Sequence, residues 1–134
     1  MPTDAVHQSQ FVLLNNSTTP VLSRMSFQVA EPFAVTVAFR AGQGRWIEWT
    51  FARDLLVTGL DEPAGIGDVR VCPDLCEDDE LVTLEIESPD GCAVFDMERA
   101  DVESFVNTTL ELVPLGTESE YFDIEVLVAE IENV

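Results

Sequence analysis

The sequence predicts an α+β domain in which antiparallel strands come first and helices come last. Before the last third of the chain, apolar and polar residues alternate along several short segments, a period typical of strands with one buried face. In the last third, apolar residues recur every three or four positions, which is typical of helices. Strands that precede helices, without alternating with them, favour antiparallel sheets. We expect about seven strands, a short helix after the fourth strand and two C-terminal helices, in one domain that spans residues 1–134.

Four strands are expected in the first part of the chain. Residues 11–14 form a short, weakly patterned candidate, and residues 24–29 alternate more clearly. Residues 33–40 and 45–51 alternate throughout, and the glycine-rich residues 41–44 between them predict a hairpin.

The fourth strand places its two tryptophans on opposite faces. Trp49 shares a face with Phe51 and is expected in the core. Trp46 faces the other way, so either a helix covers it or it is exposed at an interface, and the sequence leaves both alternatives open. Other strands also carry apolar residues on both faces, as in Val94 beside Phe95. Because one small domain rarely covers both faces of a sheet, this pattern predicts a homo-oligomer.

A short helix is expected directly after the fourth strand. The apolar residues that share its inner face are Ala52, Leu55, Leu56 and Leu60. We expect Gly59 to end this helix in the left-handed conformation that glycine adopts easily. Arg53 and Asp54 open the helix and are candidates for a local ion pair.

Three further strands and two helices complete the predicted fold. Strands are expected at residues 68–72, 81–87 and 92–97, and the turn at 88–91 joins the last two as a hairpin. The next helix has an apolar face formed by Val102, Phe105, Val106, Leu110 and Val113, and it ends at Pro114 and Gly116. The final segment follows Asp123 and places Ile124, Leu127, Val128, Ile131 and Val134 on one helical face. It is rich in valine and isoleucine, so a strand is an alternative there.

The charge of the chain excludes several classes of partner. There are 26 acidic residues against six basic ones, all six basic residues are arginines, and the formal net charge is −20. Nucleic acid and anionic lipid are bound mainly through lysine and arginine, and six arginines spread along the chain predict neither partner. A halophilic or lineage-wide acidic bias is the alternative explanation of the charge.

The sequence also predicts where the protein resides. No segment approaches the roughly 20 apolar residues that a membrane helix needs, so we expect no membrane insertion. The first ten residues lack the pattern of a secretory signal, which favours a cytoplasmic protein.

Few residues are suited to catalysis or metal binding. The chain has no lysine, and its one histidine, His7, is expected in a loosely held terminus. Cys72, Cys76 and Cys92 are odd in number and are expected as buried or half-buried free thiols. The acidic run at 77–80 is expected to be a solvated loop. We therefore predict no catalytic residues, no cofactor and no metal.

Two blocks of sequence carry a family resemblance. The first block consists of Phe51, Ala52, Arg53, Asp54, Leu55 and Leu56, and the second contains Gly67, Asp68, Val69 and Arg70. With these blocks the chain resembles the SsgA-like proteins, the sporulation and cell-division regulators of actinobacteria. Phe105, Thr108 and residues 113–118 fit the C-terminal half of that family. The resemblance covers nearly the whole chain, and the two blocks in this order are specific.

The resemblance implies a non-enzymatic regulator that acts by protein–protein contacts. Members of this family govern septum-site selection and recruit the tubulin-like division protein FtsZ. Their fold is similar to that of the whirly-type single-stranded nucleic-acid binders, and they assemble as trimers. The expected partners are therefore FtsZ and other SsgA-like proteins, in the cytoplasm at the division septum, with a trimer as the favoured homo-oligomer. The alternatives are a single-stranded nucleic-acid-binding protein, which the charge disfavours, and a cell-wall hydrolase.

The matched blocks are expected to be largely structural. Phe51, Leu55 and Leu56 have the spacing of core residues, and the glycines are expected where the backbone requires them. The candidate partner surface is the short helix with its following loop, because loops on a rigid scaffold often carry contacts. Its residues are Arg53, Asp54, Asp61 and Glu62.

Overall fold

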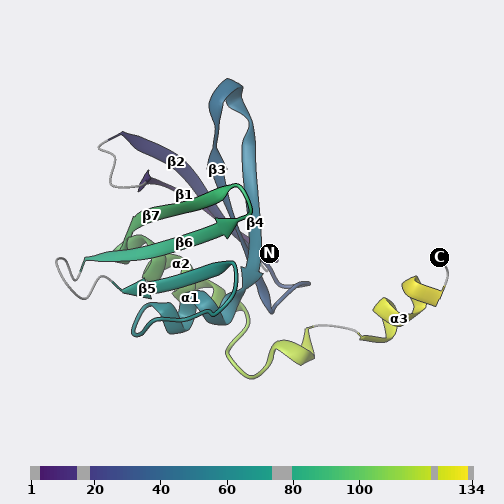
Figure 1. Ribbon diagram of the computed structural model, residues 1–134. Helices are drawn as coiled ribbons and strands as arrows, with labels where there is room; N and C mark the ends of the chain where they lie inside the picture. Colours follow the sequence, from purple (N-terminus) through teal and green to yellow (C-terminus); the bar gives the residue numbers. More distant parts are fainter. Residues whose placement is uncertain (1–3, 15–18, 74–79, 122–123, 133–134) are drawn as a thin grey trace.

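A computed structural model describes residues 4–14, 19–73, 80–121 and 124–132 of the protein. These residues form one antiparallel sheet with the strand order β4-β3-β2-β1-β7-β6-β5, accompanied by three α-helices, and the predicted α+β class is confirmed (Figure 1). The strands are β1 (Ala5–Leu14), β2 (Pro20–Gln28), β3 (Ala34–Arg40), β4 (Trp46–Ala52), β5 (Val69–Pro73), β6 (Leu81–Ser88) and β7 (Gly91–Glu98). The helices are α1 (Arg53–Gly59), α2 (Arg99–Leu112) and α3 (Ile124–Glu132), with short 3₁₀ turns η1 (Gly42–Gly44) and η2 (Glu118–Glu120).

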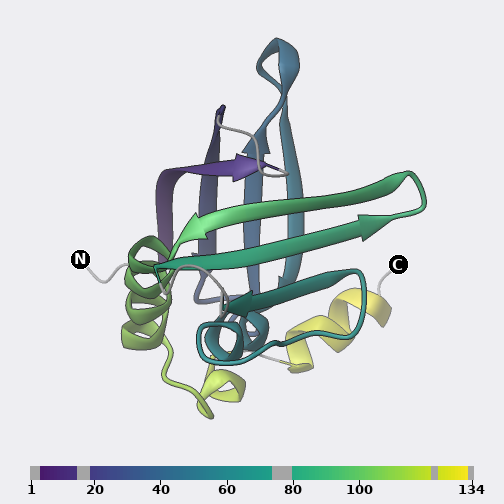
Figure 2. The ribbon, with the colours of Figure 1, turned by 60° about the vertical axis from the view of Figure 1, so that its left-hand side comes forward.

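The sheet consists of two meanders joined at one short junction. Strands β1–β4 pair in sequence order, and so do β5–β7. The end of β1 joins the two halves through the pairs Leu13–Asp96 and Leu14–Phe95. Strands β6 and β7 run across β2, β3 and β4, so the sheet curls around its core (Figure 2). Inward side chains of both halves pack together there, among them Phe27, Val37 and Leu84.

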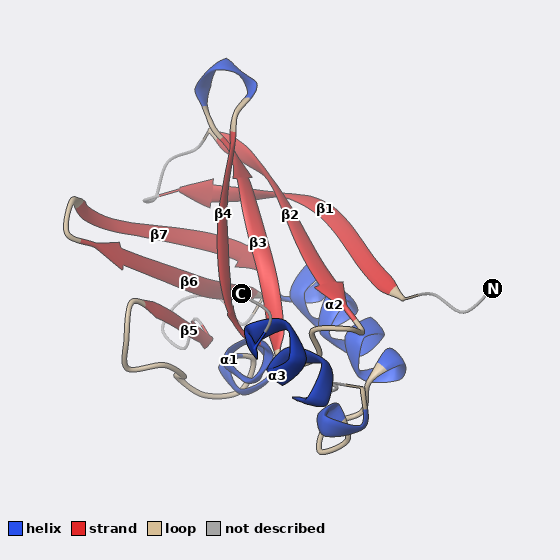
Figure 3. Ribbon diagram, turned by 90° about the vertical axis from the view of Figure 1, so that its right-hand side faces the viewer, coloured by secondary structure: helices blue, strands red, loops and turns tan. Residues whose placement is uncertain are grey.

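Two of the helices lie at the same end of the curled sheet (Figure 3). Helix α1 begins directly after β4, and α2 begins directly after β7. Helix α2 buries Val102, Phe105 and Val106 in the core, on the face that the sequence predicts. The final segment is helical, so the strand alternative is wrong, and α3 stands clear of the sheet (Figure 1).

Strand β1 is longer than the sequence indicates. It begins at Ala5, not at residue 11, because its inward residues Gln8 and Gln10 are polar and give no apolar alternation. The prediction that His7 lies in a loosely held terminus is wrong: its Nδ1 lies 3.1 Å from the hydroxyl oxygen of Ser26 on β2.

Gly59 is needed for a different reason from the one predicted. The glycines with positive φ are Gly44, Gly65, Gly91 and Gly116, so Gly59 does not end α1 in the left-handed conformation. A Cβ at Gly59 would instead lie 2.6 Å from Cβ of Val71 and 3.0 Å from its carbonyl oxygen. The missing side chain therefore lets α1 pack directly on β5.

The loop after α1 covers the outer edge of β5. The backbone N–H of Ala64 donates to the carbonyl of Val71 at 2.8 Å, and the N–H of Val71 donates back to Ala64 at 3.0 Å. Gly65 follows with φ of +99°, and a Cβ there would overlap the carbonyl oxygen of Val69. Only glycine allows the chain to turn so close to the strand.

Candidate interaction surface

The described residues contain no cluster suited to a metal ion. No three histidine, cysteine, aspartate or glutamate side chains among them lie close enough to share a metal. None of the helices in the described ranges has the length and apolar character needed to cross a bilayer. The acidic residues 77–79 and Cys76 lie outside the described residues.

An apolar pocket of about 440 Å³ opens at the end of the sheet opposite α1 and α2. Its wall includes Ile47 at the start of β4, whereas α1 follows the end of that strand. Phe39 of β3 and Phe95 of β7 stack across the two halves of the sheet, with ring centroids 3.9 Å apart. Both rings belong to the core and also line the pocket, so they separate the core from the pocket's opening.

Side chains on the core face of the sheet are left uncovered at this pocket. Ile47 is 48% exposed, although it shares a face with the buried Phe51. Trp49, expected in the core, is only half-buried: it packs against the core and also lines the pocket. Cys92 also lines the pocket and is an exposed thiol, so the prediction of burial is wrong for it, while Cys72 is half-buried. The helices cover only one end of the sheet, which leaves these apolar residues in contact with solvent.

Arginines gather around Trp46 at the same end of the sheet, on the opposite face from this pocket. The guanidinium carbon of Arg24 on β2 lies 4.7 Å from the centre of the Trp46 ring, and that of Arg40 on β3 lies 5.4 Å from it. These distances are typical of cation–π contacts. Arg40 is the cross-strand neighbour of Trp46 and also lines the pocket. Arg45 directly precedes Trp46, and we name Arg24, Arg40, Arg45 and Trp46 the arginine–tryptophan cluster.

The cluster answers two open questions from the sequence. No described helix packs over Trp46; it is half-buried beneath two guanidinium groups. The six arginines are spread along the sequence, yet three of them lie at this one end of the sheet. The predicted loop at 41–44 would place Arg40 opposite Arg45, whereas the observed register places Arg40 opposite Trp46.

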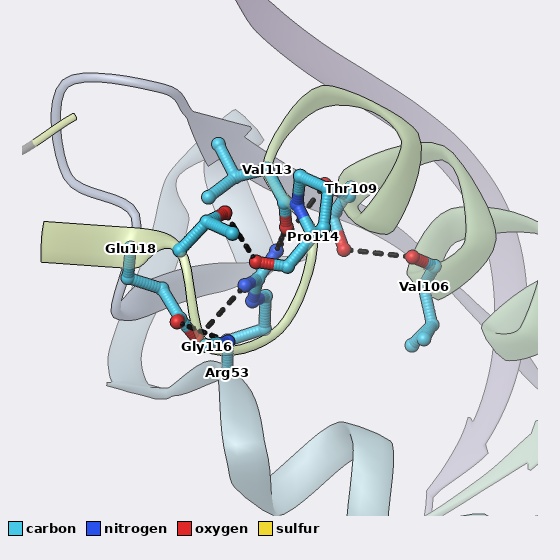
Figure 4. A network of polar contacts seen from close by, with 8 residues as sticks. Arg53, Val106, Thr109, Val113, Pro114, Gly116 and Glu118 are labelled. Carbon is cyan, nitrogen blue, oxygen red and sulfur yellow. Dashed lines mark hydrogen bonds and ion pairs between the residues drawn. The ribbon is translucent and has the colours of Figure 1, made fainter. Parts of the chain in front are cut away.

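Arg53 is not part of a surface. It is only 1% exposed, so the prediction that it contacts a partner is wrong, and it forms no ion pair with Asp54. The chain turns from β4 into α1 at this point, which directs the Arg53 side chain beneath the end of α2 (Figure 4). The other residues of the predicted surface, Asp54, Asp61 and Glu62, are exposed.

Arg53 fastens the end of α2 instead (Figure 4). Its Nη1 donates to the carbonyl oxygens of Thr109 at 3.2 Å and Val113 at 2.7 Å. Its Nη2 forms an ion pair of 3.0 Å with Oε2 of Glu118. The Thr109 carbonyl also accepts the backbone N–H of Val113 at 2.8 Å, whereas the Val113 carbonyl lies past the end of the helix, where a buried cation supplies a donor. Glu118, far away in sequence, balances the buried charge.

Comparison with known proteins decides the family. A sequence model described as "Streptomyces sporulation and cell division protein, SsgA" matches residues 21–118. The chain belongs to the SsgA family. The resemblance inferred from the two sequence blocks is thereby confirmed.

Relatives within the SsgA family cover most of the chain. It is 44% identical to the sporulation-specific cell division protein SsgB of Salinispora tropica, over 81% of this chain and 78% of the relative. It is 38% identical to the SsgB of Streptomyces coelicolor, over 87% and 85% respectively. A crystal structure of an SsgA-like sporulation-specific cell division protein from Thermobifida fusca has a TM-score of 0.81 and 34% identity, covering 97% of this chain and 98% of the other.

Each of the two SsgA-like sequence blocks contains residues that differ in their exposure to solvent. Phe51, Arg53 and Leu56 are buried and Leu55 is half-buried, whereas Ala52 and Asp54 are exposed. In the second block, Gly67 and Asp68 are exposed, and Val69 and Arg70 are half-buried. Arg70 forms ion pairs with Glu85 and Glu87 on β6. These placements support a structural role for the buried members and leave Asp54 and Asp68 accessible to a partner.

The Arg53–Glu118 pair predicts acid-sensitive stability in this SsgA-family protein. A hydrogen bond from its own backbone N–H and the Arg53 guanidinium lower the pKa of Glu118. A carboxylate with a lowered pKa stabilises the fold above its unfolded pKa of about 4.3, and this contribution is lost as the pH falls through the folded pKa. In urea unfolding, wild type should exceed Glu118→Gln in stability by a constant amount above about pH 5. The difference should shrink below about pH 4.3, and a difference that is flat down to acid pH would contradict the pairing.

Proposed function

We propose that this protein is a non-enzymatic regulator of sporulation-specific cell division that acts by contacts with other proteins. One observation carries the proposal: the described residues present an open apolar pocket on one face of the sheet and an arginine–tryptophan cluster on the other face of the same end. Tryptophan and arginine are enriched among the residues that carry the binding energy of protein interfaces. The SsgB relatives, named sporulation-specific cell division proteins, support the biological process.

The proposal extends to the partners of the protein and to its location in the cell. The protein selects septum sites and recruits FtsZ in the cytoplasm at the division septum, and it assembles with itself and with other SsgA-like proteins. A trimer is the favoured homo-oligomer. The net charge of −20 opposes binding of nucleic acid and so disfavours the alternative of a single-stranded nucleic-acid-binding protein.

The surface proposed for FtsZ is the loop face after α1. Asp54, Asp61 and Glu62 are exposed there, and Ile66 in the same loop is fully exposed. An isoleucine surrounded by acids offers an apolar contact together with electrostatic repulsion of an acidic partner. Binding through Ile66 would therefore be helped, not weakened, by salt that screens the repulsion.

Co-sedimentation with FtsZ polymers tests this proposal. We expect binding to stay constant or rise from about 50 to about 300 mM salt, because the Debye length shortens from above to below about 10 Å. Ile66→Asp should weaken binding about tenfold or more, the loss expected of a residue that carries binding energy. Ile47→Asp makes the same substitution at an exposed residue at the other end of the sheet and is the control. It should leave the affinity of each chain for FtsZ unchanged. Binding that collapses as salt rises would contradict the apolar contact, and binding unaffected by Ile66→Asp would exclude the loop.

A further inference from the structure

We propose that the outer face of the sheet at the arginine–tryptophan cluster binds a short segment of a partner protein that is acidic and partly apolar. The segment lies across strands β1–β4 and offers its carboxylates to Arg24 and Arg40. This inference rests on the proposed function, a regulator that acts by contacts with proteins, and it names the chemistry of one of those contacts.

The arginines of the cluster lack the carboxylate partners that the other arginines have. The three arginines outside the cluster each form an ion pair with a glutamate of their own chain: Arg53, Arg70 and Arg99. Among the described residues, no carboxylate forms an ion pair with Arg24, Arg40 or Arg45. A shortage of carboxylates is not the reason, since the chain has 26 acidic residues. The fold leaves these cations available to an anion from outside the chain.

The two guanidinium groups over Trp46 are close enough to share one ligand. From the distances to the ring centre, their carbons are at most about 10 Å apart, which is within a Debye length at 0.1 M salt, so the two charges repel each other. A guanidinium that lies over an aromatic ring still has N–H donors along its edge, in a geometry that matches a carboxylate. Neighbouring carboxylates of one segment can therefore neutralise both cations.

Exposed apolar side chains lie on the same face beside these arginines. Arg24 pairs with Ser9 across β2 and β1, so it shares its face with Ser9 and with Phe11 two residues further on. Phe11 is thus a diagonal cross-strand neighbour of Arg24, within reach of a long side chain. Phe11 is 63% exposed, and Leu13, which follows it on the same face, is 36% exposed. A ligand that pairs with the arginines can also bury an apolar side chain here.

The face has room for an extended segment of a protein. Figure 3 shows strands β1–β4 side by side. Four strands span roughly 15 Å, and about eight extended residues span roughly 26 Å, so such a segment can cross all four strands. Alternate side chains of the segment point to the same side, which allows two carboxylates and an apolar side chain to face the sheet together.

A single strand of nucleic acid fits this face less well. Proteins that bind single strands use aromatic rings on which the bases stack. The ring of Trp46 is half-buried beneath Arg24 and Arg40, so a base would have to displace them. Each phosphate also meets the repulsion of a chain of net charge −20, whereas a short acidic segment brings only a few charges into that field.

Fluorescence anisotropy with a labelled synthetic peptide tests the inference. The peptide has leucine, glutamate, glutamate and leucine at alternate positions with serine between them, and the control peptide has glutamine in place of each glutamate. Wild type should bind the acidic peptide at least about tenfold more tightly, as expected when charge-assisted hydrogen bonds are gained. The affinity should fall severalfold from about 50 to about 300 mM salt. Equal binding of the two peptides, or an affinity that does not fall with salt, would overturn the proposal.

Substitutions at exposed or half-buried positions locate the contact. Arg24→Gln and Arg40→Gln should each weaken binding of the acidic peptide about tenfold, because each removes one guanidinium group. Arg70→Gln on β5 removes the same charge outside the cluster and should leave the affinity within about twofold of wild type. Glu48 lines a polar hollow with Arg24 without forming an ion pair to it. Glu48→Gln should therefore tighten binding about twofold, a gain that loss of folding cannot imitate. If both cluster variants bind the peptide like wild type, the proposal is wrong.

Two other occupants of the cluster are outcomes of the same experiment. A single-stranded oligonucleotide that displaces the peptide from wild type would assign the cluster to nucleic acid. A wild-type oligomer that dissociates on Arg40→Gln would assign the cluster to a second copy of the chain. Either result overturns the proposal.

Failure of this inference is distinguishable from failure of the proposed function. The contact proposed for FtsZ depends on Ile66 and stays constant or rises with salt, whereas the peptide contact depends on Arg24 and Arg40 and falls with salt. If Ile66→Asp weakens co-sedimentation with FtsZ and the acidic peptide does not bind, only the inference fails. If the peptide binds as expected and FtsZ does not co-sediment, the proposed FtsZ contact fails and the inference stands.

Discussion

Replacing Arg53 with methionine should lower the free energy of unfolding by about 3–5 kcal/mol, the loss expected when one partner of a buried ion pair is removed. Methionine fills much of the same space but donates no hydrogen bond. The Val113 carbonyl would lose its Arg53 donor, the Thr109 carbonyl would keep only the backbone N–H of Val113, and Glu118 would lose its counter-charge in a buried position. The measurement is urea unfolding followed by far-ultraviolet circular dichroism at pH 7.

Arg70→Met is the matched control for this substitution. Arg70 also forms ion pairs with carboxylates, but its side chain is 33% exposed and its contacts are 3.4 and 3.5 Å long. A solvent-screened surface pair of this kind contributes little to stability, so the control should remain close to wild type. Equal losses for the two variants would show that the Arg53 network does not stabilise the fold beyond an ordinary surface pair.

Gly59→Ala should destabilise the protein by about 1–3 kcal/mol, the range found for overpacked sites. In an exposed helix the same change stabilises by roughly 1 kcal/mol, because alanine has the higher helix propensity. Here the new Cβ would overlap Val71 on β5, which is fully buried and cannot move aside without disturbing the core. The sign of the effect is therefore opposite to that expected from propensity.

Thermal unfolding of a small series checks this prediction. Gly67→Ala is the control, because an added Cβ there meets nothing within 4 Å and Gly67 has no positive φ. Val71→Ala should reduce the penalty of Gly59→Ala, since it removes Cγ1 of Val71, the atom that the new methyl group overlaps most, while Cβ and the carbonyl oxygen remain. If the two substitutions are simply additive, the contact between α1 and β5 does not explain the need for glycine.

The sequence predicted most of the fold because most elements have a strong local pattern. Strands β3, β4 and β6 alternate without interruption, and α2 has a continuous apolar face. The sequence does not indicate the first half of β1 because Gln8 and Gln10 take inward positions, where the Gln8 amide donates to Oε1 of Gln10 and to the carbonyl oxygen of Asp101. A polar inward residue removes the only periodic signal that a strand leaves in its sequence.

The candidate surfaces were harder to predict because they depend on contacts between distant residues. Arg53 and Glu118 are 65 positions apart, and a neighbouring aspartate offered a simpler but incorrect partner for the arginine. The pocket arises where Phe39 and Phe95 meet from opposite halves of the sheet, which local periodicity does not indicate. Sequence patterns show which face of a strand is apolar; whether another element covers that face is decided by the tertiary fold.

The loop that pairs Ala64 with Val71 has a consequence for how the protein behaves at high concentration. An open sheet has two edge strands, and their unpaired backbone groups invite other chains to add strands and aggregate. The loop occupies the outer edge of β5 at its centre, so this edge is closed to such growth. The edge at β4 is instead flanked by Glu48 in a molecule of net charge −20, where mutual repulsion keeps copies from stacking strand to strand. The sheet can thus remain open without becoming a template for fibres.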